Sequence, residues 1–156
     1  MEKSHRYDLR LDWTGARQGP TLKYESYSRE YRIDIAGKPA LIGSADPAFC
    51  GDVSLHNPED MLVAALSSCH MLSYLALCAR SRIAVVAYTD AASGTMSETA
   101  PHRVGFTEVT LRPRVMIAAA ADAAKAKALH AQAHEICFIA NSVNFPVRHE
   151  AEIVVR

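Results

Sequence analysis

The chain has 156 residues and a mass of 17.0 kDa, the size of one domain, so we expect a single domain over residues 1–156. Apolar residues make up 49% of the chain and charged residues 22%, a balance that excludes a disordered or fibrous protein. Seventeen basic and seventeen acidic side chains give a net charge of zero. That balance argues against binding to nucleic acid or to an anionic membrane surface.

The beginning of the chain, MEKSHRYDLRLDW, has no apolar run, so we expect neither a signal peptide nor a membrane anchor. We therefore expect a cytoplasmic location, where the four cysteines are buried structural thiols, metal ligands or redox-active groups instead of a disulfide framework. Residues 61–79 contain no charged side chain but several polar ones. We interpret this segment as the central buried helix of the protein and expect no membrane span.

Two segments near the start alternate between apolar and polar residues, which predicts strands. In residues 7–13 (YDLRLDW) one face is apolar and the other charged. Residues 27–35 (YSREYRIDI) alternate in the same way but place Arg29 on the apolar face. Residues 36–56 are rich in glycine and proline and predict a long loop.

The first helix has a clear start. Asn57 is a favoured N-cap residue, Pro58 suits the first helical position, and we expect the helix to run to about Ser81. Its apolar surface is larger than a few short strands can cover, so we expect a second copy of the chain to cover it.

The remaining elements follow from the same patterns. We expect a turn-rich stretch over residues 93–105, a sheet edge at Pro113 and a second helix from Asp122 to about Asn141. The expected strands cover residues 83–91, 106–117 and 145–155. The order is β-β-α-β-β-α-β, and the fold class is α+β.

Three of the cysteines lie on the two predicted helices. Cys69 and Cys78 are nine residues, or 2.5 turns, apart, so they point to opposite sides of one helix and Cys78 is interpreted as a packing residue. Cys137 lies near the end of the second helix. Composition alone does not show that Cys69 and Cys137 meet, and each is equally compatible with a buried packing thiol.

The segment NPEDMLVAALSSCHM and, some seventy residues later, AHEICFIANS resemble the OsmC/Ohr family of osmotically inducible and organic hydroperoxide resistance proteins. The resemblance covers essentially the whole chain. It implies antiparallel sheets packed around two central helices, an intertwined homodimer, and a thiol-dependent peroxidase without a bound cofactor. Two residues depart from the family's pattern: Phe138 stands where proline is common, and His70 is an unusual neighbour of the reactive cysteine.

The resemblance also implies roles. Cys69 corresponds to the thiol that attacks peroxide, Cys137 to the resolving thiol, and Glu59 to the acid of the N-P-E motif. A buried thiolate needs a cation, and Arg29 is the preferred candidate because an inward arginine needs an anionic partner. Arg17, in the TGARQG turn, is the alternative. Glu59 lies about 15 Å along the helix from Cys69, so we expect it to brace the guanidinium instead of touching the thiol.

The expected wall of the site is apolar, which suits an alkyl or fatty-acyl hydroperoxide better than hydrogen peroxide. Its residues are Leu66, Met71, Tyr74, Phe138 and Ile139. The chain does not indicate what reduces the resulting disulfide. The resemblance suggests an external dithiol, namely a dihydrolipoyl group.

Two other interpretations remain open. His130, His134 and Cys137 share one helical face, and Cys69 can complete a tetrahedral metal site. Because the chain lacks a CxxC or HExxH motif, no metal is expected. The second alternative is a non-catalytic homodimer of the same fold that binds a small apolar ligand.

Overall fold

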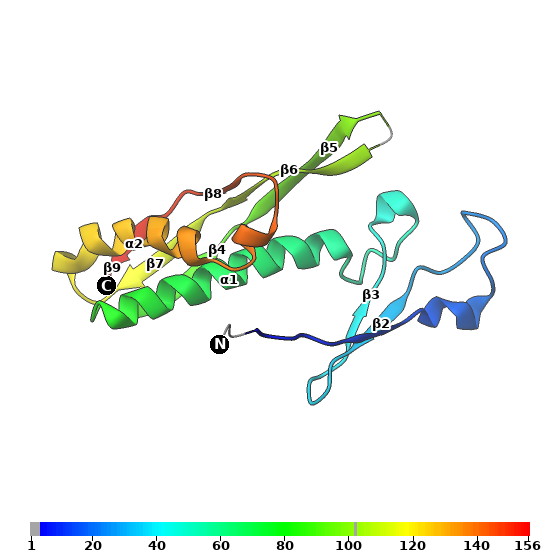
Figure 1. Cartoon of the computed structure of the whole chain (residues 1–156), viewed down its shortest axis with the longest axis horizontal. Coiled ribbons are helices and arrows are strands. Elements are labelled where there is room, and N and C mark those ends of the chain that lie inside the picture. Colours follow the sequence, from blue (N-terminus) through cyan, green and yellow to red (C-terminus); the bar gives the residue numbers. More distant parts are fainter. Residues whose placement is uncertain (1–3, 102) are drawn as a thin grey trace. The chain divides into compact units, whose positions relative to one another are not determined.

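The computed structural model describes residues 4–101 and 103–156, and these form two compact units, Met1–Met61 and Leu62–Arg156. Helices and sheets both contribute, which confirms the α+β class (Figure 1). Each unit has its own sheet structure, and the long helix α1 (Pro58–Arg80) begins in the first unit and continues through the second.

The first unit contains a three-stranded antiparallel sheet in the order β1-β2-β3. Its strands are β1 (Arg10–Asp12), β2 (Tyr31–Asp34) and β3 (Leu41–Gly43), and its short 3₁₀ helices are η1 (Thr14–Gln18) and η2 (Pro47–Phe49). The expectation of a loop throughout residues 36–56 is therefore wrong at β3. The strand ends on Gly43, where an added Cβ would lie 2.4 Å from the ring of Tyr31. This close approach explains a glycine inside a strand.

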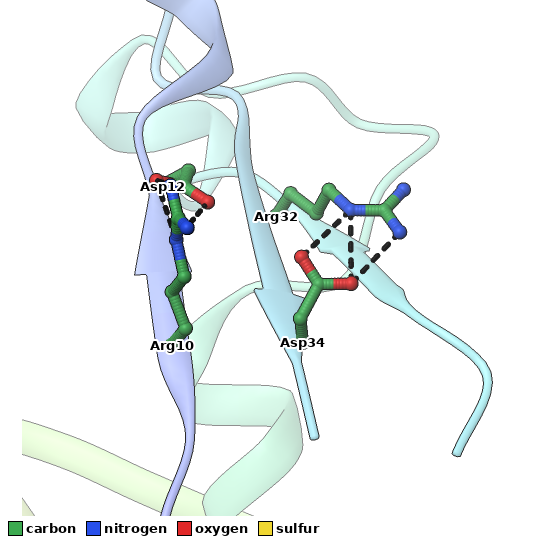
Figure 2. A network of polar contacts seen from close by, with 4 residues as sticks. All are labelled: Arg10, Asp12, Arg32 and Asp34. Carbon is green, nitrogen blue, oxygen red and sulfur yellow. Dashed lines mark hydrogen bonds and ion pairs between the residues drawn. The ribbon is translucent and has the colours of Figure 1, made fainter. Parts of the chain in front are cut away.

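Four charged residues form a pattern of alternating sign on one face of this sheet. Arg10 pairs in register with Asp34, and Asp12 with Arg32. Within each strand the side chains two residues apart also bond, with Arg10 Nε 2.9 Å from Asp12 Oδ2 and Arg32 Nη2 2.8 Å from Asp34 Oδ1 (Figure 2). The hydrogen bond from Arg32 lowers the pKa of Asp34. Because all four side chains are exposed, they specify the strand register more than they add stability.

Helix α1 starts as the sequence predicts. The Asn57 side-chain oxygen accepts a hydrogen bond from the main-chain N–H of Asp60 at 2.7 Å. By length and composition alone the helix can cross a membrane, a property it shares with core helices. Every fourth residue of its middle and end is buried, and these residues form the stripe that faces the core of the second unit: Leu66, His70, Tyr74 and Cys78.

The second unit contains two three-stranded sheets, in the orders β4-β7-β9 and β5-β6-β8. Their strands are β4 (Val85–Asp90), β5 (Ser93–Ala100), β6 (Arg103–Leu111), β7 (Pro113–Ile117), β8 (Val147–His149) and β9 (Glu152–Val155). The pairs β4–β7 and β5–β6 are antiparallel, whereas β6–β8 and β7–β9 are parallel. The sheets are therefore mixed, not purely antiparallel.

The strands β4, β6 and β8 each lead directly into a strand of the other sheet, β5, β7 and β9 (Figure 1). We call the line of these three crossings the crease. The crossings lie at residues 91–92, at Arg112 and at residues 150–151. Arg112 joins them, because its side chain bonds Glu150 at 3.1 Å and the Ser93 hydroxyl at 2.8 Å. Its main-chain N–H donates to Asp90 Oδ1 at 2.6 Å.

The crease explains three differences from the sequence-based expectations. Residues 106–117 and 145–155 each form two strands instead of one, because the chain changes sheet within each segment. Pro113 opens β7, which is the middle strand of its sheet and not an edge; a first position is where a strand tolerates proline. The stretch over 93–105 is not turn-rich but forms β5 and the start of β6, with residue 102 outside the described range.

Helix α2 (Ala123–Ile136) is shorter than expected and ends before Cys137. The helix is preceded by η3 (Ala120–Asp122), and Asp122 makes no side-chain capping bond. After the helix the chain turns through η4 (Ala140–Ser142). One hydrophobic cluster joins α1 and α2 to β7, and a second joins Leu66 of α1 to β6.

Candidate functional site

The structure brings Cys69 and Cys137 together within the second unit. Cys69 lies in the middle of α1 and is half-buried, whereas Cys137 directly follows α2 and is only 1% exposed. The two thiols are close enough to share a hydrogen bond, and both are free. Cys78 is buried in the core beside Tyr74, as expected for a packing residue, and Cys50 is exposed.

The turn after α2 shapes the surroundings of Cys137. Burial raises the pKa of the Cys137 thiol, and the hydrogen bond with Cys69 raises it further. A hydrogen bond from the main-chain N–H of Ala140 lowers the same pKa, but by less than burial raises it. Hydrogen bonds from Asn141 to the Cys137 carbonyl, at 3.0 Å, and from the Ser142 hydroxyl to the Phe138 carbonyl, at 2.8 Å, hold the turn. Cys137 is therefore a protonated thiol at neutral pH, held in a fixed position.

Cys69 opens into a groove of about 600 Å³ on the surface of the second unit. Its walls are apolar apart from two serines and an arginine at one end. The lining residues are Ala65, Ser68, Cys69, Leu72, Ser73, Ala76, Arg80, Ile136, Phe138 and Ile139. Because Cys137 is not among them, a molecule in the groove meets Cys69 first.

Two of the five residues expected to wall the site line this groove, namely Phe138 and Ile139. Leu66 and Tyr74 do not, because both are fully buried in the hydrophobic core. Met71 is half-buried and also lies outside the groove. The face of α1 that carries Cys69 supplies the wall instead.

The missed residues carry a signal in the sequence. Ala65, Leu72 and Ala76 lie four residues before, three residues after and seven residues after Cys69, the spacing of one helical face. Counting in steps of three and four from Cys69 identifies them and excludes Tyr74, which lies five residues after it. The same count does not exclude Leu66, three residues before Cys69, which is buried in the core. The helical period, not the residue type, is the useful criterion here.

Arg29 and Glu59 both line a separate cavity of about 380 Å³ within the first unit. Aromatic rings form much of its wall, including Trp13, Tyr27 and Tyr31. Burial and the nearby Glu59 carboxylate raise the pKa of Tyr31. The cavity thus combines one cation, Arg29, with two carboxylates, Asp46 and Glu59, and apolar surface.

The guanidinium of Arg29 is held by its own loop. It donates hydrogen bonds to the main-chain carbonyls of Tyr27 and Tyr24. The Cζ atom of Arg29 lies 3.8 Å from the centre of the Tyr27 ring. Within residues 4–101 and 103–156, Arg29 and Glu59 form no ion pair, so the expected bidentate brace is absent. Arg17 is exposed on η1 and does not line the cavity.

The histidines considered for a metal site have other neighbours. His130 is fully buried between Tyr74, at 3.9 Å between ring centroids, and His70, whose Nε2 lies 3.0 Å from His130 Nδ1. His134 lies beside His149. Among the residues that the structure describes, no group of three or more potential ligands is arranged to hold a metal ion.

Comparison with known proteins now identifies the family. The model of the OsmC-like protein family matches residues 51–152. An OsmC-like protein of unknown function from Vibrio cholerae shares 31% identity and a TM-score of 0.86, with 96% of this chain and all of that chain covered. The chain therefore belongs to the OsmC-like family.

Two structures at lower identity share the fold. An organic hydroperoxide resistance protein from Elizabethkingia anophelis has 16% identity and a TM-score of 0.70, with both chains fully covered. A second, from Legionella pneumophila, has 18% identity and a TM-score of 0.64, with 97% and 100% of the two chains covered. No curated protein sequence matches the chain.

Proposed function

We propose that this protein is a thiol-dependent peroxidase that reduces organic hydroperoxides. The observation that supports the proposal is the contact between Cys69, which opens into the groove, and Cys137, which is buried behind it. An accessible thiol next to a protected one is the arrangement that a two-cysteine peroxidase requires. The names of the Elizabethkingia and Legionella relatives agree with this assignment.

The proposed reaction has two steps. The Cys69 thiolate attacks the terminal oxygen of the hydroperoxide, the O–O bond breaks, and the alkoxide leaves and takes up a proton to become an alcohol. The Cys69 sulfenic acid then reacts with the Cys137 thiol. Cys137 sulfur bonds to Cys69 sulfur, the S–O bond breaks, and the hydroxide leaves with the thiol proton as water. An external dithiol, for which we propose a dihydrolipoyl group, reduces the disulfide.

The groove supports an organic substrate over hydrogen peroxide. Leu72, Ile136 and Phe138 present apolar surface beside Cys69, and Phe138 is 79% exposed. An alkyl or fatty-acyl chain loses contact with water on this surface, whereas hydrogen peroxide gains nothing from it. Arg29 lines a cavity separate from the groove, together with Glu59 and Asp46, and we retain it as the proposed source of the cation that favours the thiolate.

The exposed apolar surface also supports a homodimer. Apolar side chains outside the groove are exposed as well, among them Leu22 (80%), Val53 (85%) and Val104 (60%). In a symmetric dimer the same apolar surface of each chain covers that of the other, so neither copy leaves this surface exposed to water. Sedimentation at low micromolar concentration is expected to give about twice 17.0 kDa, and a monomer would contradict this proposal.

The proposed activity is tested by following the consumption of cumene hydroperoxide and of hydrogen peroxide with dihydrolipoic acid or glutathione as reductant. The wild-type protein is expected to turn over fastest with the organic peroxide and the lipoyl dithiol. Cys69→Ser is expected to abolish turnover, whereas Cys50→Ser, at an exposed cysteine, is the matched control. A wild-type protein whose thiols oxidise no faster than free cysteine is instead a ligand-binding protein of this fold.

A further inference from the structure

Four histidines from three elements gather inside the second unit. They are His70 on α1, His130 and His134 on α2, and His149 at the end of β8. The ring centroids of His70 lie 5.3 Å from His130 and 5.6 Å from His149, and those of His134 and His149 are 6.0 Å apart. His70 and His130 are at most 1% exposed.

One hydrogen bond in this cluster joins the two helices that carry the cysteine pair. Nε2 of His70 lies 3.0 Å from Nδ1 of His130. His70 directly follows Cys69 on α1, and Cys137 is the first residue after α2, seven residues beyond His130. Neither His70 nor His130 lines the groove that contains Cys69.

The bond requires an N–H on one ring and an unprotonated nitrogen on the other, so at least one of the two rings must be neutral. Burial lowers the pKa of His70 to about 4, helped by His149 and His134 and opposed by Asp90 of β4. Burial, with His70 and His149, lowers the pKa of His130 to about 3. The Tyr74 ring stacks on His130, and the Tyr88 ring of β4 lies beside Tyr74, 6.1 Å away between ring centroids.

A disulfide constrains the positions of two helices strictly. Its Cα atoms must lie about 4.4–6.8 Å apart with a dihedral angle near 90°, and one residue of an α-helix advances about 1.5 Å along the axis. A slide of α2 along α1 by about one residue is enough to separate the thiols. A short, buried bond between two rigid rings resists that slide.

We propose that the His70–His130 hydrogen bond is a positioning element that holds α2 in register with α1, so that Cys137 reaches Cys69 sulfur when the disulfide closes. The proposal deepens the proposed function, in which this closure is the second step. His70 and His130 are positioning residues, because neither touches the substrate or the reacting sulfur atoms.

Exchange with oxidised glutathione tests the positioning without any peroxide. Cys69 attacks the glutathione disulfide and forms a mixed disulfide, releasing one glutathione thiolate; Cys137 then attacks Cys69 sulfur and releases the second. The equilibrium of this exchange gives the effective concentration of Cys137 at Cys69. Because it does not depend on peroxidase activity, failure of this inference and failure of the proposed function are distinguishable.

The variant His70→Leu/His130→Leu removes both partners of the bond together, so neither ring is left buried without the other and we expect the protein to fold. We expect its effective concentration to fall at least tenfold. His130→Asn offers a neutral amide near the position of Nδ1 and is expected to recover much of the loss. His149→Leu, at an outer ring that does not make the bond, is the control and should stay within about twofold of wild type.

The peroxide reaction provides the second measurement. In the double leucine variant the rate of Cys69 oxidation is expected to stay within about threefold of wild type, while the share of Cys69 that becomes sulfinic acid rises as in Cys137→Ser. A folded double variant with wild-type effective concentration overturns the inference. Equal losses in the double variant and in His149→Leu also overturn it, since they show a general packing effect.

Discussion

Arg29 illustrates how far a single residue can be understood from the sequence. Its place on the apolar side of an alternating segment indicates an inward charge, and the structure gives it a half-buried position beside Glu59 in one cavity. The sequence does not indicate its immediate partners, because main-chain carbonyls carry no signal in the side-chain pattern. Two carbonyls and the Tyr27 ring hold the guanidinium where an ion pair with Glu59 was expected.

Arg29→Ala tests the proposed cation. Removing the proposed cation takes away stabilisation of the attacking anion, so we expect the rate constant for attack on peroxide to fall at least tenfold. Arg29→Lys should recover only part of the rate, because an ammonium lacks the planar fork. Stopped-flow kinetics measures both.

Arg17→Ala, at an exposed position, is the matched control and should change the rate little. If Arg17→Ala abolishes activity while Arg29→Ala only lowers the melting temperature, the two roles are exchanged.

At the scale of elements, the two helices are predictable and the strands are less so. The start of α1 at Pro58 follows from a local capping pattern. The split of residues 106–117 into β6 and β7 does not follow from any local pattern. The alternation of apolar and polar residues continues through Arg112, and only the partner strand changes, from β5 for β6 to β4 for β7. A crease between sheets is a long-range feature, and single-segment periodicity cannot detect it. The contact between Cys69 and Cys137 is likewise long-range.

Asp90 is the acceptor that joins this crease to α1. Its carboxylate accepts from the Arg112 main-chain N–H and from the Ser67 hydroxyl, both at 2.6 Å. Asp90→Ala leaves both donors without this partner, so we expect the free energy of unfolding to fall by about 2–3 kcal/mol in urea titrations. Asp34→Ala breaks an exposed ion pair and should cost less than about 1 kcal/mol. If the two variants lose similar free energies of unfolding, the hydrogen bonds of Asp90 do not stabilise the crease.

At the scale of the whole molecule, the buried histidines make stability depend on pH. The pKa of His70 is about 4 and that of His130 about 3 in the folded protein, both below the ordinary value of about 6.5. As pH falls below about 6.5 the unfolded chain binds protons that the folded protein does not, so stability decreases until the folded pKa values are reached.

Between pH 7 and pH 4 we therefore expect wild type to lose at least about 1.4 kcal/mol more than His70→Leu/His130→Leu, the equivalent of one pKa unit. Comparing the two proteins cancels the contribution of carboxylates such as Asp34, which both retain. Chemical denaturation at several pH values provides the measurement. Parallel stability curves would show that the two rings titrate normally in the folded state.

The central claim is that Cys69 and Cys137 form one redox pair. Non-reducing peptide mapping by mass spectrometry, after addition of one equivalent of cumene hydroperoxide to the reduced protein, tests it most directly. We predict a single dominant disulfide, between Cys69 and Cys137, with Cys50 and Cys78 still reduced. A disulfide from Cys69 to Cys50 or Cys78, or oxidation spread over all four thiols, would contradict the account.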